Sequence, residues 1–453
     1  MSKIFIDTMG CPKNQEDSER AAGLLLHRGH EIVFSPEEAD VIVVNTCGFI
    51  DDAKKESIDK ILELAQYKDY DSSKKMIVTG CLTQRYGDEL YEELKEVDAI
   101  MGVNDYSDMP AIVENILNED DQTRLLKTMG KPDFVKGERV PLYTTHTAYL
   151  KIAEGCSNNC SYCIIPKIRG PYRSISMEEV MKDAESLVDK GAKELVLIAQ
   201  DVSAYGIDVY KEYALAKLLK KLCTIENLKW IRLLYCYEDR ITDELIDVIA
   251  SEDKVCNYID IPLQHISKNV LSKMNRNSTP EGIKETISKL RQRVPDIAVR
   301  TTFITGFPGE TEKDFDELRN FVEKEQFDRL GVFSYSKEEG TAAYHMTDQI
   351  PSETADGRRD EIMRTQMDIS FTKNEKMIGK IYDVLIDEIQ DGMCFGRTMY
   401  DAPEIDNSVI INIDEEKNKG EDDEINVGDF VRVEIVDAYD YDLIGEIINE
   451  STQ

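Results

Sequence analysis

The sequence predicts a mixed α/β protein of three domains, two of them built on parallel sheets and the last one all-β. Three observations support this prediction. Short β-branched runs alternate with amphipathic helical segments up to about residue 373. A polar stretch without clear periodicity interrupts this alternation at residues 121–145. After residue 375 only short strands and turn residues follow, and 453 residues are too many for one ordinary core.

Residues 1–120 are expected to form a doubly wound α/β domain. The expected strands KIFIDT, VIVVNT and KMIVTG are each followed by a helix-like segment such as DSERAAGLLLHRG. This strand-then-helix rhythm is typical of a parallel sheet covered by helices. The polar stretch 121–145 is expected to be a linker.

Residues 146–373 repeat the alternation six times. Six βα units favour an open, partial barrel over a closed eight-stranded one. The strand candidates are AYLKIAEG, ELVLIAQD, WIRLLYC, YIDIPLQH, AVRTTFITG and LGVFSYS.

Residues 375–447 are expected to form a small all-β barrel. YDVLIDEI, SVIINI and DFVRVEIVDA are its strand candidates, and the charged run EEKNKGEDDE between them is expected to be a solvated loop.

The composition limits which cellular compartment and which kinds of partner are expected for this protein. No apolar run approaches the roughly 18 to 20 residues of a membrane span, and MSKIFIDTMG lacks the layout of a signal peptide, so we expect a cytoplasmic protein without a membrane partner. In that compartment ten cysteines indicate metal or redox chemistry, or buried packing, rather than disulfides. The net charge of −34 would repel phosphate backbones and favours a basic partner.

Three cysteines lie close together in EGCSNNCSYC. Cys156, Cys160 and Cys163 form a C-x3-C-x2-C pattern directly after a predicted strand. Closely spaced thiolates are typical ligands of iron–sulfur clusters. A structural zinc site would need a fourth ligand, and no second C-x2-C or H-x-H pair follows. The pattern therefore predicts a 4Fe–4S cluster with one iron open to a small molecule; an incomplete zinc site or chance spacing is the alternative.

This pattern resembles that of the radical S-adenosylmethionine (SAM) superfamily, including the aromatic Tyr162 before the last cysteine. The resemblance implies that the open iron binds SAM and that an electron from the cluster cleaves SAM to a 5′-deoxyadenosyl radical. The partial barrel fits the same superfamily. Gln200 at the end of the second barrel strand, and Gly306 and Pro308 in the turn after the fifth, are candidate SAM-binding residues.

A second set of cysteines comprises Cys11, Cys47 and Cys81, in MGCPKNQ, NTCGF and TGCLTQ. Each follows the carboxyl end of a predicted strand and precedes a helix. In a parallel sheet such ends share one edge, so the three loops can converge, and a helix N-terminus favours the thiolate form. Three unrelated buried cysteines are the alternative.

Two three-cysteine sets, a radical-SAM barrel and a small β-module together resemble the methylthiotransferase family over nearly the whole chain. The resemblance implies that Cys11, Cys47 and Cys81 hold a second 4Fe–4S cluster and that the β-module is a TRAM domain. It also implies that one SAM supplies a methyl group, that another supplies the radical, and that sulfur reaches an unactivated C–H bond through the second cluster. The six cysteines would then be the catalytic ligands.

Three segments resemble the branch of this family that modifies an aspartate of ribosomal protein uS12: MGCPKNQEDSE, YLKIAEGCSNNCSYCIIPKIRG and GRTMYDAPEID. Charge favours the same branch, because residues 375–453 carry 22 acidic and 6 basic side chains, a net of −16, which suits a basic protein better than RNA. We expect the acidic module to dock this protein and place the target aspartate near the radical, and an electron donor such as a flavodoxin or ferredoxin. The alternatives are a tRNA adenosine methylthiotransferase, an iron–sulfur electron carrier, and an RNA-binding TRAM protein with structural metal sites.

Overall fold

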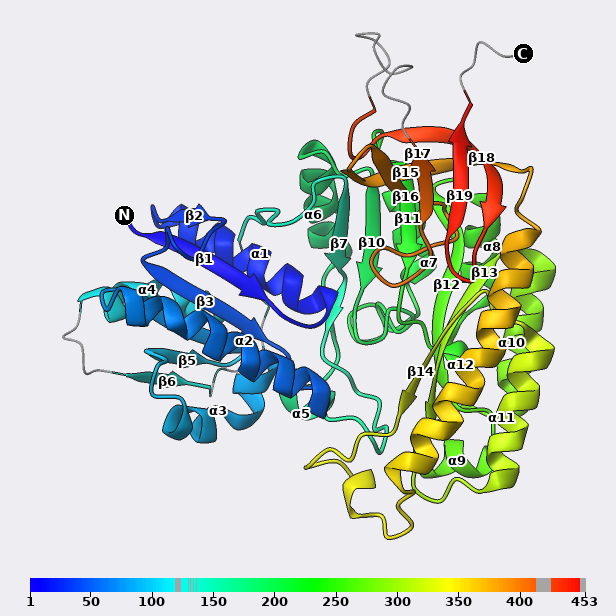
Figure 1. The fold of residues 1–453 in the computed structure, drawn as a ribbon, viewed down its shortest axis with the longest axis horizontal. Coiled ribbons are helices and arrows are strands. Elements are labelled where there is room, and N and C mark those ends of the chain that lie inside the picture. The colour runs from blue at the N-terminus through cyan, green and yellow to red at the C-terminus, as the bar shows by residue number, and fades with distance from the viewer. Residues whose placement is uncertain are drawn as a thin grey trace. The chain divides into compact units, whose positions relative to one another are not determined.

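The computed structural model describes residues 1–118, 124–128, 130, 132, 134–135, 137–412 and 425–448 (Figure 1). The chain forms two compact units. The first comprises residues 1–143, 153–173 and 336–344, and the second comprises residues 144–152, 174–335 and 345–453. None of the helices in the described part of the chain has the length and apolar character of a membrane span.

The first unit contains a six-stranded sheet with the order β2-β1-β3-β4-β5-β6, in which all neighbours are parallel. It confirms the predicted doubly wound α/β fold, and the three predicted strands match β1, β3 and β4 residue by residue. Part of the stretch expected to be a linker forms the edge strand β6. The elements are β1 (Lys3–Thr8), α1 (Pro12–His27), β2 (Glu31–Val33), β3 (Val41–Thr46), α2 (Asp51–Tyr70), β4 (Lys75–Gly80), α3 (Cys81–Glu93), β5 (Ala99–Met101), η1 (Tyr106–Asp108), α4 (Met109–Asn118) and β6 (Leu125–Lys127).

Alternating side chains of this sheet build two cores. Val41 and Val43 of β3 pack on one face with α1 and α4, whereas Ile42 and Val44 pack on the other face with α2 and α3. All four are buried. Because both faces are covered by helices, β3 is buried along its whole length rather than at alternate residues.

The other two segments of the first unit contribute β8 (Ala153–Glu154), α5 (Ile165–Arg169) and the loop 336–344. Glu338 is buried and accepts hydrogen bonds from Lys54 of α2 at 3.0 Å and from Arg85 of α3 at 2.8 Å. The Ala343 amide donates to the Ser161 carbonyl at 2.8 Å. These contacts tie segments distant in the sequence to the helices of the first sheet.

The second unit contains an open six-stranded parallel sheet with the order β14-β13-β12-β11-β10-β7, as the six predicted βα units require (Figure 1). The elements are β7 (Thr147–Lys151), α6 (Met177–Asp189), β10 (Glu194–Ile198), α7 (Leu215–Leu222), β11 (Trp230–Leu233), η2 (Glu238–Arg240), α8 (Asp243–Ser251), β12 (Val255–Gln264), α9 (Lys268–Lys273), α10 (Pro280–Arg293), β13 (Ala298–Thr305), α11 (Glu312–Glu325), β14 (Arg329–Ser334) and α12 (Ser352–Glu375). A two-residue strand, β9 (Arg173–Ser174), pairs with β8 where the chain passes between the units, and η3 (Ala343–His345) precedes α12.

The β-module that follows is a closed five-stranded barrel with the order β15-β16-β17-β19-β18. The prediction named three of these strands and did not name β16 or β19, and the loop EEKNKGEDDE lies outside the described residues. Apolar side chains from all five strands fill the barrel. The strands are β15 (Ile381–Gln390), β16 (Met393–Arg397), β17 (Val409–Asn412), β18 (Phe430–Ala438) and β19 (Leu443–Ile447).

Buried ion pairs attach the module to the parallel sheet. Arg397 of β16 contacts Glu194, the first residue of β10, at 2.8 Å, and Glu194 also accepts from Arg232 at 2.7 Å. Asp401, in the GRTMYDAPEID segment, accepts from Arg329, the first residue of β14, at 2.8 Å. All five side chains are nearly or completely buried. The module is therefore fixed to the amino-terminal ends of the sheet strands.

The expectation that the module docks the target protein and places its aspartate near the radical stays a prediction, and two features of the second unit bear on it. Gln200 and Gly306 follow the carboxyl ends of β10 and β13, the opposite ends of the strands. Asp401 and its neighbour Asp406 are paired with arginines inside the protein, so they do not contribute to an acidic docking surface. The net charge of a sequence segment indicates which kind of partner a module attracts. It does not show which end of a neighbouring sheet the module covers.

We expect Glu194→Gln to destabilise the second unit by about 3–5 kcal/mol at neutral pH, because it leaves two buried guanidinium groups without their shared carboxylate. Burial alone would raise the pKa of Glu194, but the positive charges of Arg397 and Arg232 outweigh it and hold the pKa at about 2. The unfolded value is near 4.5. The stabilisation is therefore complete above pH 4.5 and is lost as the pH falls towards 2.

Urea unfolding followed by circular dichroism at several pH values checks this prediction. The difference between wild type and Glu194→Gln should be large at pH 7 and should shrink below pH 4.5. Glu434→Gln, an exposed position of β18, is the matched control and should leave the unfolding midpoint unchanged. A Glu194→Gln protein as stable as this control at pH 7 would contradict the assignment.

Candidate active site

Three cysteines lie at the carboxyl edge of the first sheet. The strands β1, β3 and β4 are neighbours, so the residues that follow them share one edge. Cys11 caps the N-terminus of α1, Cys47 follows β3, and Cys81 begins α3. A Cβ at Gly10, where φ is +90°, would lie 2.6 Å from the Cβ of Cys47, so only glycine permits this close approach of the loops. The structure thus brings the three loops together.

The thiols of this set influence one another. Burial raises the pKa of Cys47 to about 12, and the proximity of Cys81 and Cys11 adds to the rise. Burial likewise raises the pKa of Cys81. The Cys47 and Cys81 thiols therefore hold their protons at neutral pH when no metal is bound, and a metal that binds them must displace these protons.

Side chains from the neighbouring helices hold the loops in place. The Asn14 amide, on α1, donates to the carbonyls of Met9 at 2.9 Å and Thr46 at 3.1 Å, and so joins the ends of β1 and β3. The Ser57 hydroxyl, on α2, accepts from the Cys47 amide and donates to the Cys47 carbonyl, both at 3.0 Å. Neither Asn14 nor Ser57 was predicted as a site residue, although Asn14 stands three residues after Cys11 in the MGCPKNQ segment.

The second cysteine set lies in the loop between β8 and α5, in the same compact unit. Cys156 and Cys160 are buried and Cys163 is half-buried. The Cys163 amide donates to the Cys160 carbonyl at 3.1 Å, and this turn brings these two cysteines together. Burial raises the pKa of the Cys163 thiol to about 12, and the nearby Cys160 and Cys156 thiols contribute to the rise.

Both sets offer three soft sulfur donors, which suits an iron–sulfur cluster with one iron left without a protein ligand. Among the residues that the structure describes, no three His, Cys, Asp or Glu side chains are grouped so as to hold a single metal ion. The remaining cysteines belong to neither set: Cys236, Cys256 and Cys394 are buried and Cys223 is half-buried.

The candidate SAM-binding residues fall in both units. Tyr162 is half-buried in the second cysteine loop, whereas Gln200, Gly306 and Pro308 belong to the second unit and follow the carboxyl ends of β10 and β13. Gly306 has φ +71°, and a Cβ there would lie 2.2 Å from the Cβ of Ala355 in α12. The need for glycine at 306 thus follows from the close approach of α12.

A buried carboxylate accepts hydrogen bonds from the backbone of the turn at Gly306. Glu310 accepts hydrogen bonds from the amides of Gly306 at 2.6 Å and Phe307 at 3.2 Å, and it pairs with Arg358 of α12 at 2.9 Å. His265, at the end of β12, is buried, and burial lowers its pKa to about 3, so its imidazole is neutral. Neither Glu310 nor Arg358 was predicted from the sequence, because an acid after a turn such as Gly306–Gly309 is typical of an ordinary helix start.

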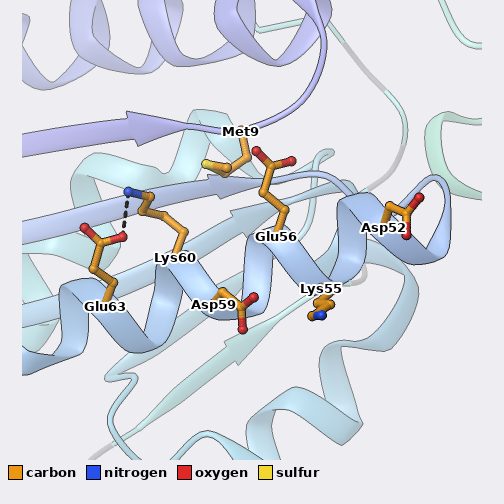
Figure 2. A pocket seen from close by; sticks show the side chains of 7 residues that line it. All are labelled: Met9, Asp52, Lys55, Glu56, Asp59, Lys60 and Glu63. Atoms are coloured by element: carbon orange, nitrogen blue, oxygen red, sulfur yellow. Dashed lines mark ion pairs between the residues drawn. The ribbon is translucent and has the colours of Figure 1, made fainter.

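A surface hollow of about 430 Å³ lies between the β1–α1 loop and the exposed face of α2 (Figure 2). Figure 2 shows Met9 above a row of charged α2 side chains, with Lys60 and Glu63 paired at 2.7 Å. None of the predicted site residues lines this hollow. The lining residues are Met9, Asp52, Lys55, Glu56, Asp59, Lys60 and Glu63.

Three family models match this chain. Uncharacterized protein family UPF0004 matches residues 3–102, the radical SAM superfamily matches residues 150–322, and the TRAM domain matches residues 378–448. Their order along the chain is that of the two parallel sheets and the β-module, which confirms the predicted fold class.

Among solved structures, TsrM from Kitasatospora setae, a radical SAM methyltransferase, is similar in fold, with a TM-score of 0.57 at 13% identity over 90% of this chain and 80% of that chain. OxsB, a cobalamin-dependent SAM radical enzyme, has a TM-score of 0.51 at 12% identity over 80% of this chain and 56% of that chain. At this identity the likeness concerns the fold alone.

Full-length relatives are much more similar. Ribosomal protein uS12 methylthiotransferase RimO of Thermoanaerobacter sp. (strain X514) is 45% identical over 98% of this chain and 100% of its own length. The protein of the same name from Clostridioides difficile (strain 630) is 47% identical over 99% of this chain and 100% of its own length. This chain therefore belongs to the RimO family of ribosomal protein uS12 methylthiotransferases.

Proposed function

We propose that this chain is a radical SAM enzyme that methylthiolates the β-carbon of an aspartate in ribosomal protein uS12. The observation that carries the proposal is the grouping of six cysteines as two sets of three within one compact unit. Full-length identity of 45–47% to relatives named as uS12 methylthiotransferases supports the same function.

Each cysteine set holds one 4Fe–4S cluster. Cys156, Cys160 and Cys163 ligate the SAM-cleaving cluster, and Cys11, Cys47 and Cys81 ligate the auxiliary one. When bound, the clusters and SAM supply the carbon radical, the methyl group and the route for sulfur. The protein keeps the cysteines in place because they lie in largely buried loops. Hydrogen bonds from the Asn14 and Ser57 side chains, and the turn at Cys163, restrict the positions of these loops.

The remaining candidate residues orient SAM and exclude water. Tyr162 stands beside Cys163, and Gln200 lies half-buried at the carboxyl end of β10, the end at which barrel enzymes bind substrates. Gly306 and Pro308 are buried and shape the turn after β13, which Glu310 closes. A dry site suits this reaction, because the radical must meet the target C–H bond rather than solvent.

The target bond explains why an acid–base site would not suffice. A β-carbon C–H bond carries no readily removed proton, so a general base is ineffective and hydrogen must be abstracted as an atom. The net charge of −34 favours a basic protein substrate over tRNA. We place the reaction in the cytoplasm, with a flavodoxin or ferredoxin as the class of electron donor.

The test compares the two substrate classes directly. The protein is reconstituted with iron and sulfide without oxygen and is supplied with SAM, a reductant, and either uS12 or unmodified tRNA. Mass spectrometry should show one methylthio group replacing a hydrogen on an aspartate of uS12, and no change in the digested tRNA. Methylthiolated adenosine instead would assign the chain to the tRNA branch, and cluster reduction without SAM turnover would indicate an electron carrier.

A further inference from the structure

Arg169 is a buried arginine of the first unit that contacts several segments distant in the sequence. It is the last residue of α5, the short helix after the second cysteine loop, and is only 3% exposed. Its Nη2 lies 2.6 Å from Asn14 Oδ1, 3.0 Å from Asp17 Oδ2 and 3.6 Å from the Cys81 sulfur. Its Nη1 lies 3.1 Å from Glu154 Oε2. One guanidinium thus contacts helix α1, a cysteine of the first set, and the strand leading into the second set.

The charge of Arg169 reaches beyond Cys81. Burial raises the pKa values of the Cys81 and Cys47 thiols, and the positive charge of Arg169 opposes this rise at both. In the reverse direction, Cys81 and Cys11 help to raise the pKa of Arg169 against the effect of burial. The guanidinium is therefore a buried cation that lies directly beside one thiol of the first set, at 3.6 Å from the Cys81 sulfur.

Burying such a charge costs desolvation free energy unless its partners are well placed. The planar fork of arginine can contact a sulfur, an amide oxygen and two carboxylates from one position, which a single ammonium group cannot do. Hydrogen bonds and charges next to cluster sulfurs are also a principal means by which proteins set cluster potentials.

We propose that Arg169 is a positioning residue that holds Cys81 towards the auxiliary cluster and raises the reduction potential of that cluster. Through Glu154 it also links the auxiliary site to the loop that carries the SAM-cleaving ligands. The proposal rests on the proposed function, because it requires Cys11, Cys47 and Cys81 to hold a cluster.

The test measures the potential of the auxiliary cluster alone. Cys156, Cys160 and Cys163 are replaced together by alanine, and the full chain is reconstituted without oxygen and titrated with a reductant by electron paramagnetic resonance. Adding Arg169→Gln should shift the ratio of reduced to oxidised cluster about tenfold towards the oxidised form, a potential about 59 mV more negative. Arg169→Lys keeps the charge without the fork and should shift the ratio less.

Two further variants keep the result interpretable. Arg169→Gln combined with Glu154→Gln avoids leaving the Glu154 carboxylate buried without its arginine, and should shift the ratio in the same direction. Arg139→Gln is the matched control, since Arg139 is equally buried and pairs at 2.9 Å with Glu19 of α1, and it should leave the potential unchanged.

The outcomes separate this proposal from the proposed function. If the triple alanine protein binds no cluster while wild type binds only one, the proposed function fails. If the triple alanine protein holds its cluster but the Arg169 variants have the potential and iron content of the Arg139→Gln control, only the role of Arg169 is overturned.

Discussion

Replacing Cys160 with alanine is expected to abolish the formation of 5′-deoxyadenosine from SAM. Cys160 is buried in the loop between β8 and α5, close to the other two thiols of its set. Loss of groups that only support metal ligands commonly costs 10–100-fold, so loss of a direct ligand should lower the rate by more than about 100-fold. Chromatography of an oxygen-free reaction with SAM and a chemical reductant measures the product, and iron analysis should show that one of two clusters is lost.

Cys236→Ala is the matched control for this experiment. Cys236 is also a buried free thiol, but it lies just after β11, outside both cysteine sets. This variant should retain two clusters and normal SAM cleavage. Deoxyadenosine formation by Cys160→Ala at the wild-type rate would remove Cys160 from the SAM-cleaving site.

Cys47→Ala should separate the two halves of the reaction. The variant removes a proposed ligand of the auxiliary cluster but leaves the C-x3-C-x2-C loop intact, so we expect SAM cleavage to continue within about twofold of wild type. Methylthiolation of uS12 should fall by more than about 100-fold, because the route for sulfur is lost. Deoxyadenosine and modified uS12 are quantified in the same samples.

For the second prediction, Cys223→Ala provides the control, because Cys223 is half-buried like Cys47 and lies after α7. It should retain both activities. If Cys47→Ala methylthiolates uS12 at the normal rate, the division of labour between the two cysteine sets is wrong.

The sequence predicted the long strands well and the short ones poorly. The strands β3 and β4 are buried along nearly their whole length, so each appears as a mostly apolar run, whereas only Ile4 and Ile6 are buried in β1. The strands β2, β5 and β6 have only three residues each, too few for a periodic pattern. In the module, β16 and β19 contain glycine, and barrel closure rather than local propensity makes them strands.

The residues that support the candidate site were not predictable from the sequence. Arg169 reads as an ordinary basic residue at a helix end, and Asn14 as one polar residue of an amphipathic helix. Their functions depend on partners 88 and 32 residues away in the sequence, at Cys81 and Thr46. No local pattern marks such a pair, because the contact exists only after the segments fold together.

The sequence by itself determined two candidate sets of three sulfur donors, and the first set follows strands whose parallel pairing brings their loops to a shared edge. Only the tertiary structure decided where charges meet, since ion pairs follow distances in space rather than spacing along the chain. It seats the acidic module on the amino-terminal ends of β7, β10 and β14 through buried arginines, and it sets one guanidinium against the thiol of Cys81. Composition could reveal the sign of those charges but not their partners.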